Sequence, residues 1–229
     1  MKRIIISVCL ILSLSISVSA QKNDLITVRA GTKVLDYFPV KERYHYQEFT
    51  AGQVVFKNGI ANTTQLNYNF LLGEIEFIQS RDTLTITRKK DIRFIVVAQD
   101  TFFYDNGYIE LVSGGNIRVG LKQYIKFKEV LKKGAYGVPA RNVSIDSYNS
   151  MATGGNFYEL IPDEDILLQK TMEYYLSTAS GGFVPFNRKN VMDQFPQKVD
   201  IIKGYLKSYK VNFESGDDLL RLAAFLRGL

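Results

Sequence analysis

The chain has 229 residues, with 29 Lys and Arg, 23 Asp and Glu, one His, one Cys and no Trp. A structural zinc site built from Cys and His needs about four such ligands, and a catalytic one about three plus water. The counts exclude both, and we expect no metal and no cofactor. The composition, 46% hydrophobic and 23% charged, excludes collagen-like, coiled-coil and wholly disordered chains.

The first twenty residues indicate a secretory signal peptide. Positive charges at Lys2 and Arg3 precede an uncharged, mostly apolar run over residues 4–18, which ends in small residues at Val18-Ser19-Ala20. Cleavage after Ala20 would leave 229 − 20 = 209 residues with a charge of 27 − 23 = +4. It would also remove Cys9, and a thiol-free exported chain fits the Gram-negative periplasm or secretion better than a eukaryotic route. No later segment is long and apolar enough to span a bilayer.

From Tyr44 to about Glu129 the hydrophobic pattern has a period of two. Leu66, Tyr68 and Phe70, for example, alternate with polar residues, which puts one strand face on a core and the other in water. Turn signals separate the runs, namely Asn58-Gly59, Ser80-Arg81-Asp82, Asn106-Gly107 and Gly114-Gly115. The sequence therefore predicts a mainly β fold: an antiparallel, hairpin-rich sheet that forms a sandwich, a curved open sheet or a partial barrel.

The rest of the chain divides into strands, a long loop and helices. The longest strand candidate covers Asn116 to Glu129, another covers Ile166 to Leu176, and a Gly-, Ser- and Asn-rich loop covers Lys132 to Gly155. After Pro185 the period becomes 3.6, with capping residues at Asn187 and Ser215. We expect a signal peptide at 1–20, an antiparallel β-domain at 21–184 and a C-terminal helical segment at 185–229.

Basic residues at even positions of the longest strand form the candidate binding site. Evenly spaced cations on one strand face can bind a polyanion such as an anionic glycan or lipid, although lysines on the wet face of a strand also protect sheet edges. Tyrosines in or beside the long loop could add aromatic platforms. The candidate ligand-binding residues are Arg118, Lys122, Tyr124, Lys126, Lys128 and Tyr136. The small charge excess and the predicted export disfavour nucleic acid.

Two other features are weaker candidates for chemistry. His45, in the segment Tyr44 to Glu48, is the only side chain that titrates near neutrality unperturbed, but the chain has no Gly-x-Ser-x-Gly elbow. We expect His45 to lie on a first strand, at its surface or end. Asp163, Glu164 and Asp165 are predicted to form a solvated turn. We therefore assign no catalytic residue.

One stretch carries a resemblance. Residues 66–78 (LNYNFLLGEIEFI), with Lys133 to Gly137 and the tail around Phe195-Pro196, resemble exported envelope proteins of unknown function from Gram-negative bacteria. The resemblance implies export and transfers no catalytic residue.

The sequence thus favours an exported, non-enzymatic binding or envelope-interaction protein whose partner is an anionic glycan, a lipid or another envelope protein. A carboxylate-dependent glycan hydrolase and a lipid carrier with a cavity inside its β-domain are the alternatives.

Overall fold

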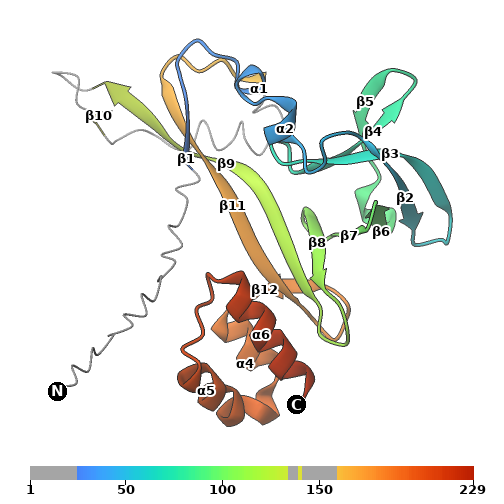
Figure 1. Cartoon of the computed structure of the whole chain (residues 1–229), viewed down its shortest axis with the longest axis vertical. Coiled ribbons are helices and arrows are strands. Elements are labelled where there is room, and N and C mark those ends of the chain that lie inside the picture. The colour runs from blue at the N-terminus through green and yellow to red at the C-terminus, as the bar shows by residue number, and fades with distance from the viewer. Residues whose placement is uncertain (1–24, 134–138, 141–158) are drawn as a thin grey trace, which may run out of the picture.

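The computed structural model describes residues 25–133, 139–140 and 159–229 of the chain (Figure 1). The strands are β1 Leu25–Val28, β2 Thr50–Phe56, β3 Ala61–Asn69, β4 Glu74–Gln79, β5 Asp82–Thr85, β6 Ile92–Val97, β7 Asp100–Tyr104, β8 Tyr108–Ser113, β9 Val119–Lys133, β10 Pro139–Ala140, β11 Asp165–Ser177 and β12 Phe183–Pro185. The α-helices are α1 Val34–Tyr37, α2 Val40–Arg43, α4 Arg188–Gln194, α5 Val199–Ser208 and α6 Gly216–Arg227. The predicted mainly β fold with a C-terminal helical segment is confirmed.

The strands form one antiparallel sheet. Their order is β1-β11-β9-β8-β7-β6-β2-β3-β4-β5, with β10 added beside β9 and β12 beside β11. Most neighbours in space are also neighbours in the chain, so short turns set most of the pairing. Within the described residues no helix is long and apolar enough to cross a membrane.

The predicted turn signals all join paired strands. Asn58-Gly59 joins β2 to β3, residues 80–81 join β4 to β5, Asn106-Gly107 joins β7 to β8, and Gly114-Gly115 lies between β8 and β9. At the third turn both Asn106 (φ 50°) and Gly107 (φ 118°) are left-handed, and three residues separate the paired Tyr104 and Tyr108, so the connection is one residue longer than the predicted two-residue type I′ turn. At the first, only Gly59 is left-handed (φ 86°), so the two Asn-Gly pairs form different turns.

The β9–β11 pair is the longest element of the fold and runs through its centre (Figure 1). Its register extends from Asp165 opposite Leu131 to Leu176 opposite Val119, with a bulge between Leu167 and Leu168. α1 and β1 lie at one end of this ribbon, and the C-terminal helices lie at the other (Figure 1).

The sheet curves so strongly that the end of β3 comes back into contact with β9, although four strands lie between the two in the sheet order. The amide of Ile125 donates a hydrogen bond to the Phe70 carbonyl at 2.9 Å. The Tyr68 hydroxyl donates another to the Gln123 carbonyl at 2.5 Å. Of the three predicted arrangements, the curved open sheet is the one observed.

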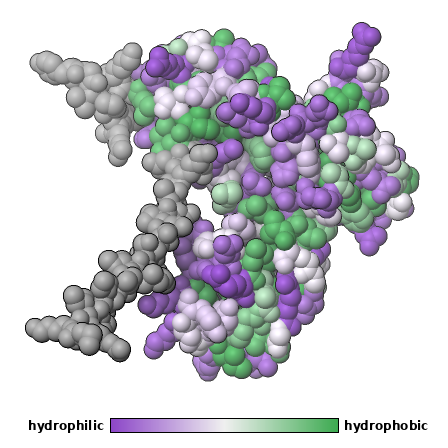
Figure 2. Space-filling view, in the orientation of Figure 1, coloured by the Kyte–Doolittle hydropathy of each residue, from purple (hydrophilic) through white to green (hydrophobic). Residues whose placement is uncertain are grey.

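Among the described residues, three apolar clusters hold the fold together. One lies between the C-terminal helices and the near ends of β9 and β11. A second joins β1 and α1 to the far ends of the same two strands. The third fills the curve of the sheet between β2, β3, β4, β6 and β7. In the space-filling view hydrophobic residues gather near β7 and β8, while hydrophilic residues tip the β4–β5 hairpin (Figure 2).

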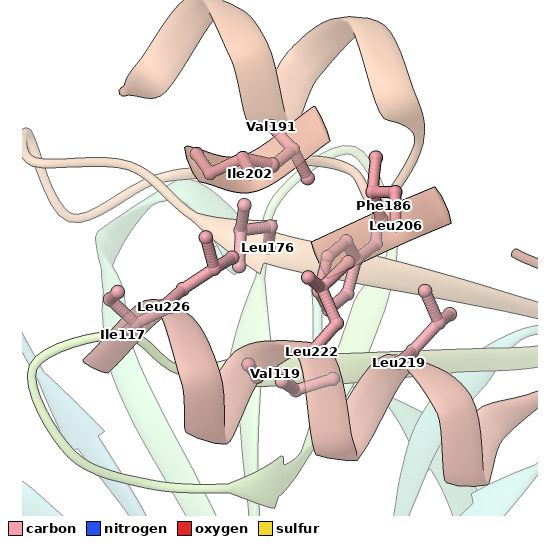
Figure 3. Packing of buried hydrophobic residues seen from close by; sticks show 11 residues of the cluster. Ile117, Val119, Leu176, Phe186, Val191, Ile202, Leu206, Leu219, Leu222 and Leu226 are labelled. Atoms are coloured by element: carbon pink, nitrogen blue, oxygen red, sulfur yellow. The ribbon is translucent and has the colours of Figure 1, made fainter. Parts of the chain in front are cut away.

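The C-terminal helices begin where the capping residues predict. The side chain of Asn187 accepts a hydrogen bond from the Asn190 amide, and that of Ser215 accepts one from the Asp218 amide. Leu219, Leu222 and Leu226 then point from α6 toward the apolar side chains of the sheet and of the other helices (Figure 3). The helical segment therefore shares its core with the sheet.

Two local expectations are wrong. His45 is not in a strand but in the segment between α2 and β2, and Tyr44 makes a single bridge to Asn69. The polar residues Asn67 and Asn69 do not face water, since only 1% and 2% of their surfaces are exposed. Both faces of this end of β3 are covered, and the alternation of polar and apolar residues did not reveal it.

Replacing Leu222 by Ala should destabilise the protein by about 2–5 kcal/mol, because Leu222 is fully buried and its loss leaves a cavity. Urea denaturation measures the change. The matched control is Ile201→Ala on α5, where the side chain is 53% exposed and the expected change is within about 0.5 kcal/mol. Equal effects of the two substitutions would contradict the docking of α6.

Candidate functional site

The predicted basic residues lie along β9 but not in one environment. Arg118, just before β9, packs its guanidinium over Phe103 at 5.0 Å and over Phe183 at 5.3 Å. It also donates a hydrogen bond to the Gly181 carbonyl at 2.9 Å. These contacts tie the β11–β12 turn to the sheet, so Arg118 has a structural role.

Lys122 and Tyr124 are brought together around a carboxylate. The Lys122 ammonium lies 5.6 Å from the centre of the Tyr124 ring and donates to the Asn106 carbonyl at 2.7 Å. Glu173 accepts hydrogen bonds from the hydroxyls of Tyr124 at 2.9 Å and Tyr175 at 3.1 Å. Burial, reinforced by Glu173, raises the pKa of Tyr175 to about 12. An anion bound here would meet the negative charge of Glu173.

The remaining predicted residues extend the basic stripe outward. Lys126 and Lys128 are exposed, and Lys128 is the residue of β9 that has no partner at the bulge. Tyr136 lies outside the described residues. Binding of an anion to this stripe stays a prediction.

The predicted acidic turn, Asp163 to Asp165, leads into β11, whose first residue is Asp165. The carboxylate of Asp165 accepts a hydrogen bond from the Ala30 amide at 2.9 Å, which fixes the chain after β1. Asp163 is exposed.

His45 lies between two carboxylates that are distant in the sequence. Its Nε2 is 3.5 Å from Oδ2 of Asp100, at the start of β7. One ligand atom from each of His45, Asp100 and Glu110, a residue of β8, lies within 4.8 Å of the others. The side chains of His45 and Asp100 are 20% and 25% exposed, so the group is partly open to water. We call these three residues the His45 cluster.

A buried asparagine holds the segment that carries His45. The Asn67 side chain accepts a hydrogen bond from the Tyr46 amide and donates to the carbonyls of Tyr46 and Glu48. The His45 amide itself donates to the Tyr68 carbonyl at 2.9 Å. The segment therefore lies along β3 as an added chain without being a strand, and its position is fixed before any ligand arrives.

Two neighbours orient the carboxylates of the cluster. The Tyr46 hydroxyl is 2.5 Å from Oδ2 of Asp100 and 3.1 Å from the Val97 carbonyl. The Gln123 amide donates to Oε2 of Glu110 at 3.3 Å. Burial raises the pKa of the Glu110 carboxyl; His45 and Gln123 oppose the rise and Asp100 adds to it.

A second polar group lies inside the curve of the sheet. Glu74 pairs with Lys89, and burial raises the pKa of its carboxyl despite that partner. Glu76 accepts a hydrogen bond from Asn69 at 2.9 Å. The buried hydroxyl of Tyr108 has no hydrogen-bond partner among the described residues. The ion pair of Glu74 with Lys89 and the hydrogen bond of Glu76 with Asn69 account for the two carboxylates, so this group has a structural role.

The curve of the sheet also leaves an apolar hollow of about 680 Å³ over β2, β3, β4, β5 and the residues that follow β5. Its apolar walls are Val54, Phe56, Phe77, Ile78, Leu84 and Ile86. Asn62, Thr64 and Arg88 supply polar groups. We call it the β2–β5 hollow. A smaller hollow of about 360 Å³ adjoins it, shares Phe56, Asn62 and Arg88, and adds Lys57 and Asp91.

No protein-family model, curated protein or solved structure matches this chain.

Replacing Asn67 by Leu should destabilise the protein by about 1–3 kcal/mol, because it leaves one buried amide and two carbonyls without their partner. Urea denaturation and amide exchange of residues 44–48 measure the effect. Gln65→Leu is the control, since Gln65 is exposed on the same strand. Unchanged exchange in the Asn67 variant would show that the asparagine does not hold this segment.

Glu110→Gln should change how stability depends on pH. A carboxyl with a raised pKa binds more protons in the folded chain than in the unfolded chain. Stability is then lost as the pH rises from the unfolded pKa through the folded pKa. The glutamine variant lacks this loss. The free energy of unfolding of the variant minus that of the wild type should therefore increase as the pH rises through that window. Urea titrations across acid to neutral pH, with chelator present, test it; a constant difference would contradict it.

Proposed function

We propose that the protein is an exported, non-enzymatic binding protein whose ligand is an anionic amphiphile, an acyl chain with a carboxylate or phosphate head. The observation that carries the proposal is the β2–β5 hollow, which combines apolar walls with a cationic rim. It refines the sequence-based expectation of a lipid or anionic partner, and export still depends on the predicted leader.

The size and lining of the hollow suit an acyl chain. Small-molecule sites commonly measure about 300–1,000 Å³ and are mostly apolar, with a few polar groups that fix orientation. The hollow of about 680 Å³ lies within that range. Leu84, which lines the hollow, is 41% exposed. Each methylene of an acyl chain buried against it would contribute about 0.8 kcal/mol to binding.

The rim supplies the charge for an anionic head. Arg88 lines both hollows, and Lys57 lines the smaller one. Arg88 pairs with Asp91 at 2.7 Å, but its side chain is 79% exposed, and such surface pairs contribute only about 0–1 kcal/mol. The guanidinium can therefore exchange this partner for a carboxylate or phosphate, which it binds with two parallel hydrogen bonds.

The geometry gives less support to a glycan hydrolase. Asp100 and Glu110 lie close together, as a pair of catalytic carboxylates would. Neither residue lines the β2–β5 hollow or the one beside it. A sugar chain would need a cleft that contains both carboxylates.

The test uses protein exported with its own leader, whose intact mass also reports whether residues 1–20 have been removed. After delipidation, it is titrated with a dansyl-labelled undecanoic acid, and then with the methyl ester of the same probe. We expect Leu84→Glu to weaken binding of the acid by about tenfold or more, equivalent to about 1.4 kcal/mol. Arg88→Gln should remove the preference for the acid over the ester.

Ile201→Glu is the matched control, because Ile201 is also an exposed aliphatic residue (53% against 41% for Leu84), and it lies on α5, far from the hollow in the chain. It should bind the probe as the wild type does. Absence of binding by the delipidated wild type, or equal affinities of the Leu84 and Ile201 variants, would refute the proposal.

A further inference from the structure

The His45 cluster has the composition of a metal site that needs no thiol. The expectation of no metal counted only cysteine and histidine, whereas carboxylate oxygens are also zinc ligands and suit manganese. One imidazole and two carboxylates supply three ligands, and water can occupy the remaining positions. Three protein ligands plus water is the arrangement of an open, exchangeable site.

The spacing of the three groups fits one ion. Bonds of about 2.0–2.2 Å to a common ion place neighbouring ligand atoms about 3–4 Å apart. The distance between His45 Nε2 and Asp100 Oδ2 is 3.5 Å, and all three ligand atoms lie within 4.8 Å of one another. Small side-chain rotations would suffice, with no movement of the strands.

Hydrogen bonds from residues outside the cluster hold both of its carboxylates. Ligating carboxylates are usually held by hydrogen bonds from outside the site, and loss of such a bond typically lowers metal affinity by about 10–100-fold. Tyr46 provides one to Asp100 and Gln123 provides one to Glu110. The Tyr46 hydroxyl bonds Oδ2 of Asp100, the oxygen that faces His45 Nε2, and a carboxylate has about four lone-pair sites, so it can accept this bond and still ligate an ion.

Charge favours a dication here. Asp100 and Glu110 bring two carboxylates into a partly buried site, where His45 packs against the aromatic rings of Tyr46, Phe70 and Phe102. A simple His–Asp ion pair would neutralise only one of them. A divalent ion would compensate both and leave the imidazole free to bind it.

We infer that His45, Asp100 and Glu110 bind one divalent transition-metal ion of the zinc, cobalt or manganese kind. Calcium and magnesium are disfavoured, because they prefer all-oxygen ligand sets. The site is separate from the β2–β5 hollow, and neither proposal depends on the other.

The experiment uses the exported chain without a histidine tag, treated with EDTA and dialysed. Isothermal titration with Zn²⁺ and Co²⁺ should show one ion per chain. His45→Ala and Glu110→Gln should each weaken binding on the order of 100-fold, and Tyr46→Phe about 10–100-fold. Glu173→Gln is the matched control, because Glu173 is another partly buried carboxylate held by tyrosine hydroxyls, and its affinity should equal that of the wild type.

A second measurement needs no variant. His45 is the only histidine of the chain, so its ring gives a single set of proton resonances. These should shift with one equivalent of Zn²⁺ and broaden with substoichiometric Mn²⁺. Unchanged resonances, no binding, or equal losses of affinity in the Glu173 and Glu110 variants would overturn the inference and leave the cluster as an ion pair.

Discussion

The pairing of β9 with β11 is the constraint on which the other parts of the structure depend. One end of the ribbon supplies Val119 and Leu176 to the core shared with the C-terminal helices. Its other end supplies Phe127 and Leu168 to the core beneath β1 and α1. Its middle meets the end of β3 and so fixes the curve of the sheet. Loss of this one pairing would therefore disrupt the two clusters at the ends of the ribbon and remove the contact that holds the curve of the sheet.

The curve of the sheet places the two proposed sites in different surroundings. Within its bend, buried amide groups hold a non-strand segment against β3, and this brings an imidazole near carboxylates from β7 and β8. Where the bend opens toward β4 and β5, the apolar side chains have too few neighbours to fill the space. Packing thus explains both the fixed positions of the His45 cluster and the apolar walls of the β2–β5 hollow.

The sequence predicted what depends on neighbours in the chain. Turns such as Asn106-Gly107 and caps such as Asn187 act within a few residues, so their outcome is visible in the sequence. The His45 cluster joins residues 55 and 65 positions apart, from 100 − 45 and 110 − 45, and no local pattern encodes that. The sequence pattern placed Asn67 in water because its partners, Tyr46 and Glu48, lie about twenty positions earlier, in a segment that was predicted to be a strand and is not one. The hollow arises from curvature, which the order of polar and apolar residues does not specify.

The bulge in β9 shifts the alternation of its side chains between the two faces by one residue. Ile125 and Phe127 lie on one face of the strand, and Val130 would face the opposite way in a regular strand, yet all three belong to the same apolar cluster. The unpaired Lys128 supplies the extra residue that makes this possible. The bulge therefore lets β9 carry one residue more than its partner strand without losing its apolar face. Without Lys128, Val130 would follow Phe127 by two positions, and regular alternation alone would keep both in the same cluster.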